Sequence, residues 1–196
     1  MESPFKEELS HFVSYTNTAL CLGSHTGVEA MLMAKLVGPS GNLFIMEPHS
    51  VAHQLLVANI QLGGFEDRTR IFKVAASDRQ GTASLHINYS NTAIRQLNPI
   101  NDSFTPSRDS NGELEQVTLD LVDKVLPERT GLDFAFVDLY GMGVDALMGM
   151  KKTIQNSPDL VILVNWNSEG LASQRDKIQD LLDMFQGLSY SLAISN

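Results

Sequence analysis

The chain has 196 residues, enough for one well-buried core and too few for two domains of ordinary size. Its 14 basic and 23 acidic residues give a net charge of −9, which repels a phosphate backbone, so no nucleic-acid partner is expected. A single cysteine excludes an internal disulfide, and no apolar run approaches the ~20 residues that a membrane-spanning helix needs. Because the N-terminal sequence also lacks the pattern of a secretory signal, we expect a cytoplasmic protein without a membrane partner.

Short apolar runs and helical patterns alternate along the chain. After a helical lead-in over residues 1–18, an apolar run at 18–23 ends in glycine, which is typical of a strand buried on both faces. Residues 27–38 then show apolar residues at helical spacing and end at Gly38-Pro39, a helix stop. The apolar stripe of this predicted helix contains Val28, Met31, Leu32 and Leu36.

A second strand-and-helix unit follows at once. Residues 41–48 have the composition of a strand and end at Pro48. Ser50 is the expected N-cap of the following helix, which stops at Gly63-Gly64. The predicted core-facing stripe of this helix contains Val51, Leu55 and Leu56.

The rest of the chain repeats this alternation. We expect a strand at 70–77 with a hairpin partner at 81–87, a strand at 132–141, a helix at 143–156, and a strand at 159–166. A tail helix with apolar residues at helical spacing and a last strand near 189–195 follow; the stripe is Ile178, Leu181, Leu182 and Phe185. Repeated βα units predict one α/β domain over 1–196, with a mostly parallel sheet covered by helices on both faces.

One segment interrupts the alternation. Residues 90–112 are rich in Asn, Ser, Asp and Pro and have no sustained period, so a long loop is expected there. A mobile surface loop and a loop that covers a substrate are both open interpretations.

The turn after the first strand and an acid after the second form a candidate cofactor site. Gly23 and Gly27 allow the backbone to approach a ligand closely, and the helix that begins near Val28 directs free N–H groups toward it. Glu47 ends the second strand, where a carboxylate is suited to accept hydrogen bonds from both hydroxyls of a ribose. The order of strand, turn, helix, strand and acid therefore predicts a site for a nucleotide-like cofactor.

Four segments carry a family resemblance, at 23–64, 74–85, 117–122 and 136–150. In order and spacing, the stretch from about Ala19 to Trp166 resembles the FkbM-type S-adenosylmethionine-dependent methyltransferases. The resemblance implies a Rossmann-like class I methyltransferase fold with S-adenosylmethionine as the cofactor. It also implies O-methylation of a hydroxyl on a sugar or a small metabolite.

The same resemblance implies roles for individual residues. The turn would hold the methionine end of the cofactor, Glu47 and the following Pro48 would lie at the ribose, and Asp138 would lie beside the sulfonium. The turn residues are Gly23, Ser24, His25 and Gly27, and those bordering the adenine would be Ala76, Ser77 and Asp78. The proton of a hydroxyl acceptor would pass to Asp138 or to His25, whose free pKa lies near neutrality.

Several acids of the family pattern are replaced in this chain. Cys21 stands where the first strand normally ends in an acid, Tyr140 and Gly143 stand at two acid positions after the fourth strand, and Asn165-Trp166 replaces another. Two alternatives to an active methyltransferase therefore stay open. One is a catalytically degenerate domain of this fold that serves as a binding or accessory module of a larger protein. The other is a nicotinamide-dependent oxidoreductase, which is disfavoured because the turn does not read G-x-G-x-x-G.

The remaining residues of note have plainer interpretations. Cys21 lies in an apolar run and is expected to be a small core residue. His49 and His53 are four residues apart but lack a third ligand nearby, so we expect surface residues and no zinc site. A second copy of the chain and a neighbouring domain of a larger chain are both open as protein partners.

Overall fold

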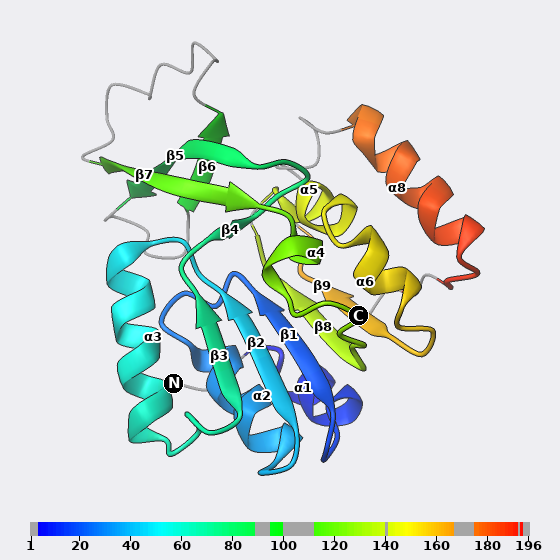
Figure 1. The fold of residues 1–196 in the computed structure, drawn as a ribbon. Coiled ribbons are helices and arrows are strands. Elements are labelled where there is room, and N and C mark those ends of the chain that lie inside the picture. Colours follow the sequence, from blue (N-terminus) through cyan, green and yellow to red (C-terminus); the bar gives the residue numbers. More distant parts are fainter. Residues whose placement is uncertain are drawn as a thin grey trace.

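The main sheet of the protein has five parallel strands in the order β3-β2-β1-β8-β9 (Figure 1). A computed structural model describes residues 4–88, 95–99, 112–139, 141–166, 175–191 and 193. The prediction that the first strand is central is confirmed, and strand order reverses beside it, where open α/β sheets bind ligands. The strands are β1 (Thr18–Leu22), β2 (Asn42–Met46), β3 (Thr69–Phe72), β8 (Phe134–Val137) and β9 (Val161–Val164).

Strand β1 is buried on both faces because its side chains alternate between two apolar layers. Leu20 and Leu22 pack in one layer, and Ala19 and Cys21 pack in the other. Cys21 is fully buried, as predicted, and burial raises the pKa of its thiol far above the usual value. The thiol is therefore an unreactive part of the core.

Helices cover both faces of this sheet, which confirms the predicted α/β class (Figure 1). The layer on one face is built from α1 (Lys6–Phe12), α2 (Val28–Val37) and α3 (Ser50–Leu62). The other layer is built from α4 (Val122–Val125), α5 (Gly143–Met148), α6 (Lys151–Gln155) and α8 (Arg175–Gly187). None of the helices in the described ranges is long and apolar enough to cross a membrane.

The buried face of α2 differs from the predicted stripe. The side chains that reach full burial are Ala30, Met33, Ala34 and Val37, whereas Met31, Leu32 and Leu36 are only partly buried. Two alanines on the buried face let the helix axis lie close to β1 and β2, so the larger side chains pack along its flanks. A pattern of large apolar residues alone therefore selected the wrong face.

The predictions for α3 need two corrections. The N-cap is His49 and not Ser50, because the His49 imidazole accepts a hydrogen bond from the Ala52 N–H at 3.3 Å. Leu56 is fully buried as predicted, but Val51 and Leu55 are 56% and 48% exposed. The helix stop at Gly63 is confirmed.

A second sheet, in the order β4-β7-β5-β6, stands beside the main one (Figure 1). The predicted strand at 70–77 is divided between β3 and this sheet, and the predicted partner at 81–87 pairs antiparallel with β6 and β7. Its strands are β4 (Ala75–Ala76), β5 (Gly81–Asn88), β6 (Arg95–Pro99) and β7 (Gly112–Asp120). The predicted loop at 90–112 thus contains β6 and the first residue of β7, while 89–94 and 100–111 lie outside the described residues.

The predicted helix at 143–156 is two helices, α5 and α6, separated at Gly149-Met150. A Cβ on Gly149 would lie 1.9 Å from the backbone oxygen of Ser77, so only glycine allows this approach to the end of β4. The break between the helices therefore sits where the chain contacts a segment of the predicted cofactor site.

The tail helix is confirmed as α8. Leu181 and Phe185 are buried, whereas Leu182, also part of the predicted stripe, is exposed. The predicted last strand does not form at 189–191 or at 193, and residues 192 and 194–196 lie outside the described residues.

Candidate functional site

The turn between β1 and α2 packs directly against the end of β8. Gly23 and Gly27 have φ values of 83° and 99°, and His25 has the left-handed value of 51°. A Cβ on Gly23 would lie 2.0 Å from the backbone oxygen of Asp138. Gly23 is therefore required by the packing of two strand ends, whether or not a cofactor is bound.

The Glu47 carboxylate joins the glycine turn to the start of α3. Its Oε2 accepts the backbone N–H of His25 at 2.7 Å, and its Oε1 accepts the backbone N–H of His49 at 2.9 Å. Glu47 is 4% exposed, and Pro48 is the one residue between it and His49. The acid predicted to bind ribose thus also holds the backbone of its own site in place.

Ser24 places a polar atom inside this turn. Its side chain is 1% exposed, and its hydroxyl has no oxygen or nitrogen hydrogen-bond partner among the described residues. The hydroxyl acts on the buried Cys21 thiol, whose pKa it lowers against the larger effect of burial. Buried hydroxyl groups are nearly always paired in folded proteins, so an unpaired one beside a glycine turn is typical of a position that a ligand completes.

His49 is buried, and the prediction that it is a surface residue is wrong. Its Nε2 lies 3.6 Å from Oε2 of Glu115 on β7, and that carboxylate also accepts the N–H and the hydroxyl of Ser50. These contacts attach the second sheet to the start of α3. In the described part of the chain, no three His, Cys, Asp or Glu side chains are grouped as metal ligands.

Segment 76–78 begins at the last residue of β4, and Ala76 packs in the same apolar cluster as Leu22, Met46 and Val137 of the main sheet. The Ser77 N–H donates to the Asp120 carbonyl at 2.9 Å, and the Asp78 Oδ2 accepts a hydrogen bond from Lys177 Nζ at 2.7 Å. Lys177 also donates to Oδ1 of Asp145 at 2.5 Å, and the Asp145 side chain is 5% exposed. Lys177 therefore connects α8 to α5 and to the segment predicted to border the adenine.

Residue patterns along the chain do not identify Lys177 or Asp145 as site residues. An acid between Val144 and Ala146 in an apolar helical run was the available signal, since a buried carboxylate needs a partner. Its partner could not be inferred, because Lys177 is 32 residues away and the contact depends on how α8 packs.

We expect Lys177→Met to lower the free energy of unfolding by about 1–2 kcal/mol, because Asp145 would stay buried without its cation. This expected loss of stability is smaller than for a fully buried ion pair because the Lys177 side chain is 41% exposed. Burial lowers the pKa of Lys177, but the hydrogen bonds to Asp145 and Asp78 outweigh it and raise the pKa above its usual value. The stabilisation of the fold by charged Lys177 is therefore complete at neutral pH, and it is lost only as the pH rises through that raised pKa.

Urea unfolding at pH 7 measures this loss, and Lys177→Arg is the matched control because it keeps the charge. A Lys177→Met protein as stable as the Lys177→Arg protein would show that the bridge does not stabilise the fold.

Asp138 lies at the end of β8, next to the glycine turn. Its N–H donates to the Leu22 carbonyl at 2.9 Å, and its Oδ1 accepts the Asn165 amide at 3.0 Å. Burial raises the pKa of Asp138; the Asn165 hydrogen bond opposes this shift, and the charge of Glu29 adds to it. A carboxyl with a raised pKa is a better proton acceptor than an ordinary one.

A small open hollow adjoins Asp138 at the ends of β8 and β9. Its empty volume of about 230 Å³ includes space that is open to solvent. The lining is mainly apolar, with one amide and one indole: Leu139, Gly141, Gly143, Val144, Val164, Asn165 and Trp166. Tyr140, one of the two residues at acid positions, lies outside the described residues.

The predicted site residues thus come together at the carboxyl ends of β1, β2, β4 and β8. The turn, Glu47 and Asp138 are connected by backbone or side-chain hydrogen bonds. The His25 imidazole lies 3.3 Å from the Thr26 hydroxyl.

No protein-family model and no curated protein sequence matches this chain. Several solved structures are similar to it. The FkbM methyltransferase from Methylobacillus flagellatus is 13% identical with a TM-score of 0.58, over 92% of this chain and 42% of that one. A precorrin-6y C5,15-methyltransferase from Geobacter metallireducens is 11% identical with a TM-score of 0.52, over 90% and 69% of the two chains. An rRNA methylase from Streptococcus thermophilus is 10% identical with a TM-score of 0.50, over 91% and 80%.

The similarity to these structures concerns the fold. The present chain spans less than half of the FkbM protein and a larger share of the other two. This protein therefore has the Rossmann-like α/β fold of the class I methyltransferases.

Proposed function

We propose that this chain is an S-adenosylmethionine-dependent methyltransferase domain of the FkbM type. The observation that carries the proposal is the buried Glu47 carboxylate at the end of β2, hydrogen-bonded to the glycine turn at the end of β1. An acid in that position beside such a turn is suited to the two hydroxyls of a ribose.

The residues present fit this cofactor. The buried and unpaired Ser24 hydroxyl offers a hydrogen bond at the turn, where the methionine end would lie. Glu47 and Pro48 would lie at the ribose, Ala76, Ser77 and Asp78 at the adenine, and Asp138 at the sulfonium. When bound, S-adenosylmethionine supplies an electrophilic methyl group on a cationic sulfur.

Positioning and charge are the contributions of this chain to the reaction. The ionised Asp138 carboxylate favours a cation held at the end of β8, and the rigid turn holds the reacting atoms in line. Asp138 also takes the proton of a hydroxyl acceptor, with His25 as the second candidate.

The acceptor that we propose is the hydroxyl of a sugar or a small metabolite. The net charge of −9 opposes a polyanionic acceptor such as RNA, and the hollow beside Asp138 is small. We place the reaction in the cytoplasm, since the single cysteine is an unpaired core residue.

A specific observation favours a second candidate, a catalytically degenerate domain that binds a ligand or supports a larger protein. The carboxylates of Glu47 and Asp78 already have protein partners, and Tyr140 and Gly143 replace two acids in the sequence. Calorimetry with S-adenosylmethionine and S-adenosylhomocysteine, followed by transfer of a labelled methyl group to a panel of sugars and small alcohols, separates the two candidates.

We expect both cofactors to bind comparably, with dissociation constants on the order of 100 μM, because few carboxylates are left to select the positive sulfur. Binding with turnover supports the methyltransferase, and binding without turnover supports the degenerate domain. Absence of binding at millimolar cofactor would contradict the proposed function itself.

Asp138→Asn should slow methyl transfer by about 10²-fold or more, since it removes the proton acceptor and the charge next to the sulfonium. The same change should raise the melting temperature at pH 7 by about 1–2 °C. Burial raises the folded-state pKa of Asp138, so its ionised form opposes folding at neutral pH, and this penalty fades as the pH falls through the raised pKa. Asparagine avoids the penalty and still accepts the Asn165 hydrogen bond.

His25→Asn is the comparison for this prediction, and it should reduce turnover less than Asp138→Asn does. Equal turnover in the wild-type and Asp138→Asn proteins would remove Asp138 from the proposed mechanism.

A further inference from the structure

Helix α3 has two apolar faces, and the sheet covers only one of them. Ala52, Leu56 and Ile60 are buried against the sheet. Three other large apolar residues of the helix are exposed: Val51 at 56%, Leu55 at 48% and Leu62 at 87%. A surface helix ordinarily presents polar residues on the face opposite the core, so this second face needs an explanation.

The exposed apolar residues form one continuous stripe. With Ala58, which is also exposed, they occupy positions i, i+4, i+7 and i+11 of the helix; the stripe residues are Val51, Leu55, Ala58 and Leu62. This is the a/d spacing by which one helix packs along another. Helix α3 lies at the edge of the molecule (Figure 1), and all four stripe residues are exposed.

The charge of α3 restricts what can cover the stripe. None of the thirteen residues of α3 is Asp, Glu, Lys or Arg, although the whole chain has a net charge of −9. The exposed polar residues on one flank of the stripe, Gln54 and Gln61, are neutral. Contact between two copies of this acidic chain at this face therefore brings no like-charged side chains of α3 together.

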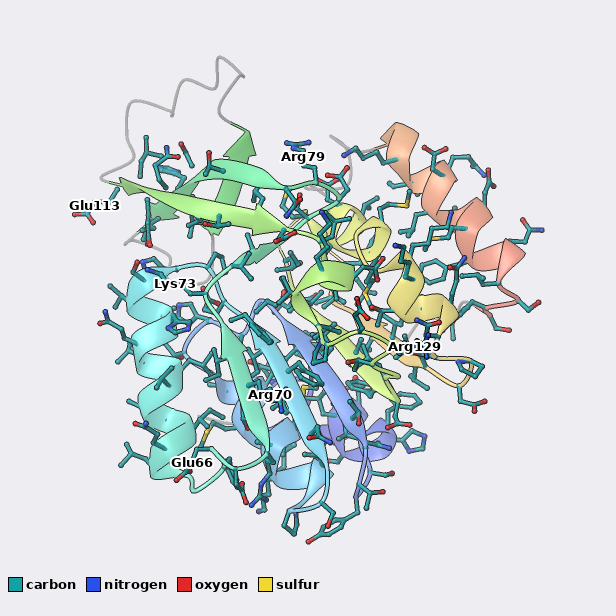
Figure 2. The ribbon with its side chains drawn as sticks, viewed as in Figure 1. Glu66, Arg70, Lys73, Arg79, Glu113 and Arg129 are labelled. Carbon is teal, nitrogen blue, oxygen red and sulfur yellow. The ribbon has the colours of Figure 1, made fainter. Side chains whose placement is uncertain are left out.

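Charged residues lie beyond both ends of α3 and outside the stripe. Figure 2 shows Lys73 toward the N-terminal end of the helix and Glu66 just past its C-terminal end, and both are exposed. The charge of Lys73 acts on His53, which lies on the opposite side of the helix from the stripe. Two stripes that meet about a two-fold axis are self-complementary in their apolar spacing.

We propose that the exposed stripe of α3 is a homodimer interface, in which two α3 helices pack antiparallel about a two-fold axis between Leu55 and Ala58. The interface is a single helix face, smaller than the ~800 Å² per partner of a standard stable complex. The dimer is accordingly weak, with a dissociation constant of about 10–100 μM. This proposal does not depend on the methyltransferase activity.

The dimer would also support the candidate site. Leu56 on α3 lies where a Cβ of Gly27 would be, and the Asn59 side chain donates to the Thr26 carbonyl at 2.8 Å. The helix that forms the interface is therefore the one that holds the glycine turn.

Sedimentation velocity of the full chain from about 1 to 500 μM tests the interface. We expect a reversible monomer–dimer equilibrium that Leu55→Glu weakens at least tenfold, because it places two like charges next to the two-fold axis. The control is Leu114→Glu, which places the same charge at an apolar residue on β7 that is 62% exposed, and it should leave the equilibrium unchanged. Both residues are exposed, and circular dichroism checks that both variants fold.

Cross-linking gives a second measurement. Cys21 is fully buried and is the only cysteine, so Ala58→Cys adds one reactive thiol at the axis. Mild oxidation should link Ala58→Cys into covalent dimers, whereas Leu114→Cys should stay monomeric. A monomer at 500 μM, or a dimer that Leu55→Glu does not weaken, would overturn the proposal.

Discussion

Gly23→Ala is expected to lower the free energy of unfolding by about 3–5 kcal/mol. The added Cβ would lie 2.0 Å from the backbone oxygen of Asp138 and 2.9 Å from a methyl of Leu139. The φ of 83° adds the strain of the left-handed region, about 1–2 kcal/mol for a residue with a Cβ. The melting temperature should fall by roughly 6–20 °C.

Gly64→Ala is a matched control for this experiment. Gly64 also has a positive φ, of 67°, but a Cβ there would meet no atom within 4 Å. Gly64→Ala should therefore show the cost of the positive φ without the cost of a steric clash. If the two variants melt at the same temperature, the close contact between the glycine turn and the end of β8 is wrong.

Glu47→Gln is expected to lower both stability and cofactor affinity. The amide has nearly the same shape, but its NH₂ group would face the N–H of His25 or of His49, leaving one buried donor unpaired. One of the two hydrogen bonds would be lost, and the other would no longer have a charged acceptor. Together these changes should lower the free energy of unfolding by about 2–3 kcal/mol. Affinity for S-adenosylhomocysteine should fall about ten- to a hundredfold, because the charged acceptor for ribose is lost.

Urea unfolding and calorimetry on the folded variant measure these two effects separately. Glu29→Gln is the control, since Glu29 is an acid in the first turn of α2, and the N–H groups of His25 and His49 donate to Glu47 instead. A Glu47→Gln protein that loses stability but binds with unchanged affinity would make Glu47 a structural residue alone. That result would contradict the ribose assignment while leaving the fold as described.

The candidate site was partly readable in the sequence because its parts are local. A glycine turn directly after an apolar strand, and an acid directly after the next one, lie at one edge of any parallel sheet, and Gly23 and Glu47 do so here. The bridge from Lys177 to Asp78 and Asp145 could not be predicted, because it joins three elements that are distant in sequence. The burial of His49 depends in the same way on Glu115 of β7, which residue patterns near position 49 do not reveal.

The class of fold could be predicted from the residues along the chain, since alternating apolar runs and helical patterns indicate which elements form and a βα order indicates a parallel sheet. The buried faces of α2 and α3, in contrast, depend on how these helices pack. In α2 the small side chains of Ala30 and Ala34 face the sheet, and in α3 Leu56 is buried while Leu55 is exposed. The spacing of apolar residues indicates that a helix has an apolar face. Whether that face packs on the sheet or stays exposed depends on how closely the helix axis approaches its neighbours.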